Sequence, residues 1–166
     1  EVCFNPCGQP AGSPADRGEV TVITVGPAES ATTLRTCLAM GADKAVLLKA
    51  PAQFMMEPFL VASALASEIK QRNYNLILAG KQAVDDDNLQ VPAMLARLLS
   101  LPFASLIVKL EINGANAIIH REIEGGAEVL EMTLPAVLTA QKGLNEPRYP
   151  SLKGIMAAKK KPMDEK

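Results

Sequence analysis

The sequence has few of the residues on which most catalytic and metal sites depend. Among its 166 residues it has no Trp, one His and three Cys. Structural zinc needs four ligands, so Cys3 and Cys7 are expected to be free thiols and no metal site is predicted. Any nucleophilic triad would have to use His120 as its base, and His120 lies in a strand-like alternating pattern, so covalent hydrolysis is not expected. So few cysteines favour a reducing compartment.

An excess of charge of one sign is also missing. The chain has 17 basic and 18 acidic side chains, and only 4% of its residues are aromatic. Without a positive field or stacking platforms, nucleic acid is not expected as a partner. No apolar run approaches the ~20 residues of a membrane span, and no leader sequence is recognisable, so a soluble chain without membrane insertion is predicted.

The residues that are present indicate one folded α/β domain. Residues 1–18 contain three Pro and three Gly and are predicted to be irregular. From residue 19 to residue 140, apolar patterns predict strands at 20–25, 45–48 and 76–78 alternating with helices near 30–40, 58–69 and 90–99, followed by strands at 105–112, 117–123, 129–134 and 135–139. The predicted fold class is therefore α/β, a three-layer α/β/α arrangement with a mostly parallel sheet of the adenine-nucleotide-binding type and an antiparallel hairpin extension.

The strongest binding candidate is the loop Gly80–Asp87, GKQAVDDD, because it follows a predicted parallel strand and precedes a helix. Doubly wound sheets bind ligands at such loops. Gly80 permits close backbone approach, and Lys81 adds positive charge for an anion at the helix start. The three aspartates allow the alternative that this loop only caps the helix, because carboxylates there already satisfy the helix dipole.

Three further segments are weaker candidates. Arg121 and Glu122 lie at a strand end, where charged side chains are usually solvated. Residues 145–152 form a proline-stiffened loop that suits either a partner surface or a linker. The run Lys159–Lys161 is expected to be a solvated tail.

Several motifs together resemble the electron transfer flavoprotein β subunit. They are GKQAVDDD (80–87), HREIEGGAEVLEMTLPAVLT (120–139), NEPRYPSLKGIMAAKKKP (145–162) and, upstream, Val25-Gly26-Pro27 followed by TLRTCLAMGADKA (33–45). The resemblance implies a non-catalytic electron carrier that pairs with an α subunit. The pair would hold FAD in or shared with the α subunit, with AMP or a second FAD in the β subunit. It would pass electrons from dehydrogenases, such as acyl-CoA dehydrogenases, to a quinone oxidoreductase or another acceptor. Bacterial cytoplasm and, alternatively, the mitochondrial matrix both suit such a chain.

The resemblance also implies site residues. The nucleotide-binding set is Asn5, Val25, Gly26, Gly80, Lys81, Gln82, Ala83, Val84, Asp85, Asp86, Asp87, Asn88, Gln90 and Val91. Within 141–166, the expected partner-recognition loop and basic segment, the recognition residues are Arg148, Tyr149, Leu152, Ile155 and Met156, with Leu152 as the anchor. Arg121 and Glu122 match a strand end that faces the α subunit.

The sequence departs from the family pattern in the expected nucleotide loop, Gly80 to Val91, and just after it. Leu89 and Val91 stand where Asn and Thr commonly donate hydrogen bonds, and Pro92 replaces Gly. Two lost polar contacts predict weak AMP binding. The family's opening strand and its C-terminal arm are not matched, which suggests a fragment. Two other readings remain: a stand-alone adenine-nucleotide-binding module, or a degenerate paralogue that binds no nucleotide.

Overall fold

The computed structural model describes residues 18–82, 87–145 and 149–166. The helices are α1 (Ser30–Ala39), the short 3-10 helix η2 (Ala52–Met56), α2 (Pro58–Ile69), α3 (Gln90–Leu99) and α4 (Leu152–Ala158). The strands are β1 (Thr21–Gly26), β2 (Lys44–Lys49), β3 (Leu76–Gly80), β4 (Phe103–Asn113), β5 (Asn116–Ile123), β6 (Gly126–Thr133), β7 (Ala136–Ala140) and β8 (Met163–Glu165).

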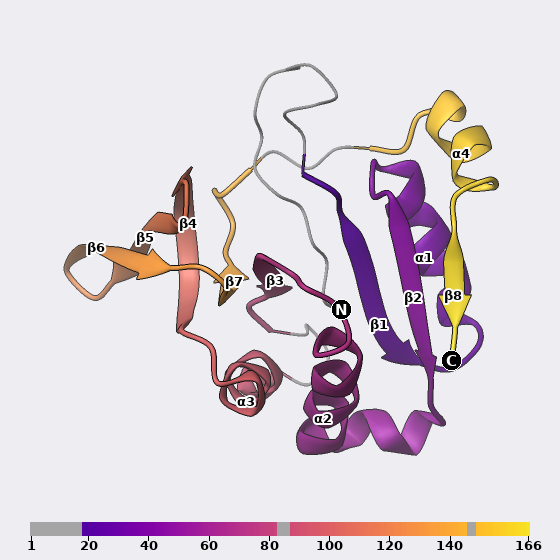
Figure 1. Ribbon diagram of the computed structural model, residues 1–166, viewed down its shortest axis with the longest axis horizontal. Coiled ribbons are helices and arrows are strands. Elements are labelled where there is room, and N and C mark those ends of the chain that lie inside the picture. The colour runs from indigo at the N-terminus through magenta and orange to yellow at the C-terminus, as the bar shows by residue number, and fades with distance from the viewer. Residues whose placement is uncertain (1–17, 83–86, 146–148) are drawn as a thin grey trace.

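The strands form two sheets (Figure 1). One is three-stranded and parallel, in the order β1-β2-β8, and the other is five-stranded, in the order β3-β7-β4-β5-β6. In the second sheet β7 pairs in parallel with both β3 and β4, while β4, β5 and β6 form antiparallel hairpins. The predicted α/β class with mostly parallel pairing and an antiparallel extension is therefore confirmed.

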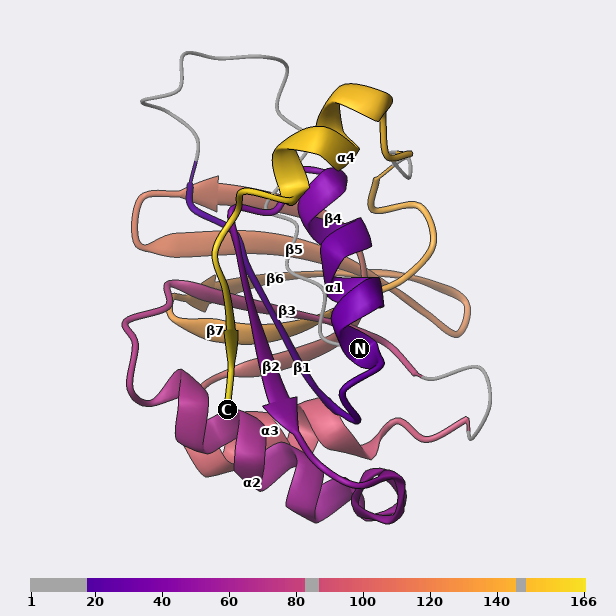
Figure 2. The same cartoon turned by 90° about the vertical axis from the view of Figure 1, so that its right-hand side faces the viewer.

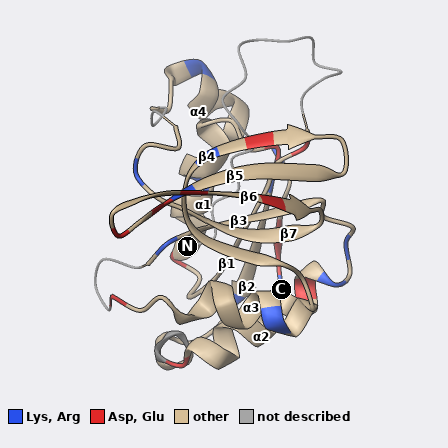
Figure 3. Ribbon diagram, turned by 90° about the vertical axis from the view of Figure 1, so that its left-hand side faces the viewer, with Lys and Arg blue, Asp and Glu red and all other residues tan. Residues whose placement is uncertain are grey.

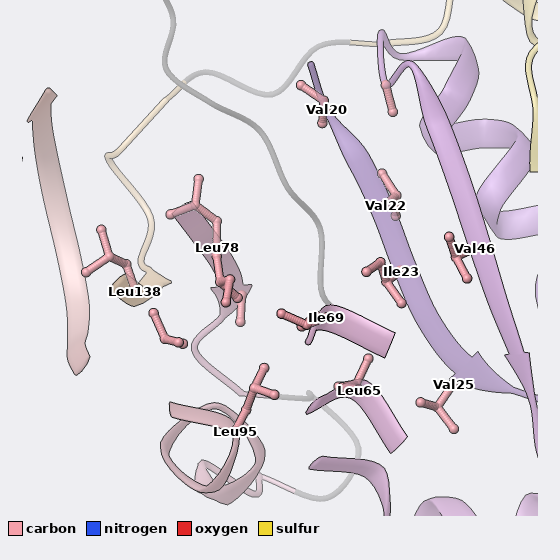
Figure 4. Close-up of a cluster of buried hydrophobic side chains, with 14 of the residues drawn as sticks. Val20, Val22, Ile23, Val25, Val46, Leu65, Ile69, Leu78, Leu95 and Leu138 are labelled. Atoms are coloured by element: carbon pink, nitrogen blue, oxygen red, sulfur yellow. The ribbon is translucent and has the colours of Figure 1, made fainter. Parts of the chain in front are cut away.

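The division into two sheets was not expected from the sequence. The sequence pattern predicts β1 and β3 in one parallel sheet, but in the described residues β1 pairs only with β2 and β3 only with β7. Both strands are nevertheless buried and share one hydrophobic core. Leu65 and Ile69 of α2 lie between the side chains of β1 and Leu78 of β3, so α2 joins the two sheets (Figure 4).

Apolar periodicity explains why these elements form where they do. Five of the six residues of β1 are buried, as expected for a parallel strand covered on both faces. Helix α2 begins at Pro58, a residue suited to the first helical position, and buries Val61, Leu65 and Ile69 at helical spacing. Burial of each such side chain contributes ~1.5–3 kcal/mol to folding.

The C-terminal segment contains two elements that the sequence did not clearly indicate. Helix α4 packs against α1, and β8 adds to the edge of the first sheet in parallel with β2 (Figure 2). Lys159 and Lys160 are exposed, as expected of a solvated tail. Lys161 is not, because its Nζ donates to the backbone carbonyls of Leu38 and Ala42 at 3.0 and 2.6 Å, so the expectation of a solvated tail was wrong at this residue.

Within the three described ranges, no helix has the length and apolar character that crossing a membrane requires.

Candidate functional site

The loop after β3 begins with a residue well placed for a ligand. Gly80 ends the strand and is exposed, and Lys81 and Gln82 after it are partly buried. Asp87 has a left-handed backbone (φ 55°), and its carboxylate accepts a hydrogen bond from the side-chain amide of Gln82. This contact joins the two ends of the loop, so the loop returns to its starting point before α3 begins at Gln90.

At the start of α3 the described residues include no aspartate that caps the helix. Its N-cap residue is Leu89, which makes no side-chain capping hydrogen bond, and its first turn contains no acidic residue. The backbone N–H of Gln90 donates instead to Oδ1 of Asn88 at 3.1 Å. Among the described residues Asn88 thus supplies the polar group at this helix start, and the Asp87 carboxylate bonds to Gln82.

The described donors at this loop suit an anion better than an adenine ring. The ammonium of Lys81 and the exposed backbone at Gly80 fit a phosphate. Leu89 is 52% exposed and offers only hydrocarbon where a donor would be needed, while the side chain of Val91 packs against the core. The described residues therefore fit AMP only in part, and they include no glycine-rich dinucleotide fingerprint for FAD.

Val25 and Gly26 end β1 and are both buried. The carbonyl of Gly26 accepts a hydrogen bond from the N–H of Ala50 at 3.0 Å. A Cβ at residue 26 would lie closer than 3.0 Å to the hydroxyl of Ser30, so glycine permits the tight passage from β1 into α1. The side chain of Val25 belongs to the core, and any ligand contact at these two residues would involve the backbone.

Arg121 and Glu122 point to opposite faces of their sheet because they are consecutive residues of β5. Arg121 forms an ion pair with Glu128 on the neighbouring strand β6. Glu122 is exposed, and its carboxylate accepts from Gln141 at 3.4 Å. A partner that covers one face of this sheet would therefore contact only one of the two side chains.

The predicted recognition residues are brought together by α4. Leu152, Ile155 and Met156 are 84%, 44% and 72% exposed, and Tyr149, just before the helix, is 88% exposed. Three exposed apolar side chains at positions i, i+3 and i+4 share one helix face. We call these three residues the α4 apolar face.

Two residues that support this face were missed by the sequence analysis. Ser151 is the N-cap of α4, and its hydroxyl accepts from the N–H of Gly154 at 3.0 Å. Gly154 contacts α1, since a Cβ there would lie closer than 3.0 Å to the carbonyl oxygen of Ala39. The serine after Pro150 was a recognisable capping signal, whereas nothing in the sequence indicated the contact of Gly154.

Some predicted site residues lie outside the described ranges. They are Asn5, Ala83, Val84, Asp85, Asp86 and Arg148. In the described parts of the chain, no three residues among His, Cys, Asp and Glu are grouped so as to hold a metal ion.

The fold is that of an α/β protein, and comparison with known proteins gives the family. Residues 11–166 match the electron transfer flavoprotein domain family. The chain belongs to this family, which confirms the resemblance found in the sequence.

Individual relatives agree with this assignment. The electron transfer flavoprotein subunit beta of Bacillus subtilis is 47% identical over 150 residues, which cover 89% of this chain and 58% of the relative. The Caffeyl-CoA reductase-Etf complex subunit CarD of Acetobacterium woodii is 42% identical over 87% of this chain and 56% of that subunit. The mitochondrial subunit beta of Oryza sativa subsp. japonica is 45% identical over 86% of this chain and 57% of its own length. The chain thus spans less than 60% of the length of each of these relatives.

Proposed function

We propose that this chain forms the core of the β subunit of a heterodimeric electron transfer flavoprotein. In this role it pairs with an α subunit, accepts electrons from dehydrogenases such as acyl-CoA dehydrogenases, and passes them to a quinone oxidoreductase or another acceptor. The observation that carries the proposal is the family match over residues 11–166 together with an exposed apolar face on α4. A cluster of exposed large apolar side chains on one helix is typical of a protein–protein interaction site.

Positive charge around the α4 apolar face supports a protein partner with an acidic docking surface. Lys153, Lys159 and Lys160 are exposed beside the face, and residues 149–162 contain no Asp or Glu. Figure 3 shows the basic segment on α4 and the acidic segments on the strands of the second sheet. An apolar centre with a basic rim suits a docking surface that has an apolar pocket bordered by carboxylates. Raising the salt concentration should therefore slow association with the dehydrogenase.

Cofactor binding in this proposal is divided between the subunits. FAD is held by the α subunit or shared with it, because the described residues of this chain lack a dinucleotide fingerprint. The loop after β3 is the site for AMP or a second FAD, with Lys81 and the Gly80 backbone on the phosphate side. If this loop holds AMP, the chain purified without its partner should be colourless, and a stoichiometric visible flavin band from this chain alone would favour a second FAD at the loop.

Two other functions compete with the proposal. A stand-alone adenine-nucleotide-binding module would use the Gly80 loop but would have no use for the α4 apolar face. A degenerate paralogue would assemble without binding nucleotide.

As for location, we propose the bacterial cytoplasm, with the mitochondrial matrix as the alternative.

The experiment that separates these functions is truncation of Leu152. Leu152→Ala in the assembled heterodimer removes the most exposed side chain of the α4 apolar face. Loss of a buried anchor commonly costs ~2 kcal/mol or more of binding free energy, so affinity for an acyl-CoA dehydrogenase should fall well over tenfold. Folding should be unaffected because the side chain is 84% exposed.

A matched control is Phe59→Ala, which removes a 56% exposed apolar side chain from α2. It should leave the dehydrogenase affinity unchanged, and flavin content should be equal in both variants. Equal affinity of Leu152→Ala and the parent complex would remove the recognition role and favour the nucleotide-binding module.

A further inference from the structure

Helix α4 has its large and small side chains in the reverse of the usual arrangement. The residues that pack toward α1 are small: Gly154 is partly buried, and Ala158, four residues later, is 3% exposed. The large apolar residues Leu152, Ile155 and Met156 are directed to solvent. A helix held only by its own hydrophobicity would bury the large residues. The position of α4 must therefore be fixed by contacts other than bulky core packing.

The first such contact is the close approach at Gly154. A Cβ at this position would lie closer than 3.0 Å to the carbonyl oxygen of Ala39, and 3.2 Å from the hydroxyl of Ser151. The obstructing oxygen belongs to the backbone of α1 and cannot turn aside as a flexible side chain would. Only glycine therefore allows α4 to lie this close to the end of α1.

The second contact is a hydrogen bond at the C-terminal end of α4. The guanidinium of Arg35 donates to the carbonyl of Ala158 at 2.8 Å, which satisfies an acceptor at the end of α4. Together with the Gly154 contact, this bond holds both ends of a seven-residue helix against α1. A helix of this length has little stability alone, so these contacts decide its direction.

We propose that Gly154 is a positioning residue for partner recognition. By lacking a side chain it seats α4 on α1, and this seating sets the direction in which Leu152, Ile155 and Met156 project toward the dehydrogenase. A face held in its binding direction loses less conformational entropy on docking, which increases affinity. The inference rests on the proposed function, and it adds a residue that touches no partner itself.

The test is Gly154→Ala in the assembled heterodimer. Helix propensity alone predicts that alanine would stabilise α4, because glycine is the poorer helix former. We expect the opposite, since the added methyl group displaces α4 from α1. Amide hydrogens of residues 152–158 should exchange faster. The apparent KM for reduction by an acyl-CoA dehydrogenase should rise about tenfold, equal to ~1.4 kcal/mol. The value of kcat should change less than about twofold, because the flavin environment is untouched.

The matched control is Gly18→Ala. Gly18 is exposed, and a Cβ there would meet no atom within 4 Å. This variant should leave KM and the exchange of α4 amides unchanged. If Gly154→Ala slows exchange in α4, or lowers thermal stability without raising KM, the positioning role is wrong.

Leu152→Ala, measured in the same assay, separates the positioning role of Gly154 from the recognition role of the α4 apolar face. If Leu152→Ala raises KM and Gly154→Ala does not, the positioning role fails while the recognition face stands. If neither variant raises KM, the proposed recognition function itself fails.

Discussion

Arg35 of α1 and Lys161, which follows α4, stabilise each other's segment. The guanidinium of Arg35 donates to the backbone carbonyl of Lys161 at 3.1 Å. The ammonium of Lys161 donates in turn to the carbonyls of Leu38 and Ala42, where α1 ends. Cations near helix C-termini satisfy unpaired carbonyls and interact favourably with the helix dipole. Segments 119 to 126 residues apart in sequence are thereby held together by reciprocal capping.

Replacing Lys161 tests this capping. Lys161→Met keeps the aliphatic stem and removes the hydrogen bonds to the carbonyls of Leu38 in α1 and Ala42 just after it. We expect a loss of about 1–2 kcal/mol in the free energy of unfolding, the typical range for charged hydrogen bonds that are partly solvated. Urea denaturation monitored by circular dichroism measures the loss. Lys160→Met is the control, since Lys160 is exposed, and an equal effect of the two substitutions would contradict the capping role.

A second network attaches β8 to α2. The carboxylate of Glu68 is buried, with 2% of its side chain exposed, and accepts from Arg72 at 3.1 Å and from Lys166 at 2.6 Å. Arg72 also bonds to Asp164 in β8 at 3.1 Å. Arg72 therefore joins the helix, the buried charge and the last strand.

We expect Arg72→Met to destabilise the fold through Glu68. A buried carboxylate that loses one of its cationic partners pays part of its desolvation cost without compensation. The loss in the free energy of unfolding should be about 2 kcal/mol. Arg97→Met, at an exposed position in α3, should cost less than about 0.5 kcal/mol. If Glu68→Gln rescues the stability of Arg72→Met, the charge explanation holds, and a further loss in the double variant would refute it.

Tyr74 gives the fold a dependence on alkaline pH. Burial raises the pKa of the Tyr74 hydroxyl, and the Thr21 side chain acts in the opposite direction with a smaller effect. Below pH ~10 the phenol is neutral in both states, so it adds no pH dependence. Above that pH the unfolded chain releases the proton first, binds fewer protons than the folded chain, and is favoured. Stability should thus fall as the pH rises beyond ~10.

The check is thermal unfolding of Tyr74→Phe between pH 8 and pH 11. The variant should lose less stability than the parent over the upper part of this range. Tyr149→Phe serves as the control, because that ring is 88% exposed. This substitution should leave the dependence of stability on pH as it is in the parent. If Tyr74→Phe loses as much stability as the parent between pH 8 and pH 11, groups other than Tyr74 cause the loss of stability at alkaline pH.

Local sequence patterns predicted individual elements well because their signals are local. The β-branched run at Val20–Val25 and the apolar spacing of Val61, Leu65 and Ile69 indicate a strand and a helix without reference to the rest of the chain. The pairing of β8 with β2 was not predictable in this way. Its three residues, Met163–Glu165, carry no strand pattern, and their partner strand β2 lies far away in the sequence.

In the candidate sites too, the sequence indicates single residues but not their tertiary contacts. Residue chemistry and resemblance pointed to Leu152 and to the Gly80 loop, and the structure shows that Leu152 is exposed and that Gly80 ends β3. The importance of Gly154 depends on the backbone of Ala39, a residue 115 positions earlier, so it is a property of tertiary packing. Spacing along the chain does not reveal contacts of that kind.

A last prediction concerns residues 89 and 91 at the end of the nucleotide loop. It compares how much AMP raises the melting temperature of each protein, not the melting temperatures without ligand. Leu89 is exposed, so Leu89→Asn removes no packing, but Val91 packs against the core and Val91→Thr places a hydroxyl there at some cost. The double variant introduces two hydrogen-bonding groups at the start of α3. The informative quantity is therefore the increase in melting temperature caused by AMP, compared within each protein.

We expect a small increase for the parent and a larger one for Leu89→Asn with Val91→Thr. A ligand that binds only the folded state stabilises it by about 2.7 kcal/mol at one hundred times its Kd, so a gain in affinity appears directly as a larger shift. Inorganic phosphate at the same concentration is the control for anion binding at Lys81 alone, and Leu89→Asn by itself separates the two positions. If the parent already responds strongly to AMP and the double variant responds no more, then Leu89 and Val91 are not lost contacts and the loop binds its nucleotide through Lys81 and the backbone.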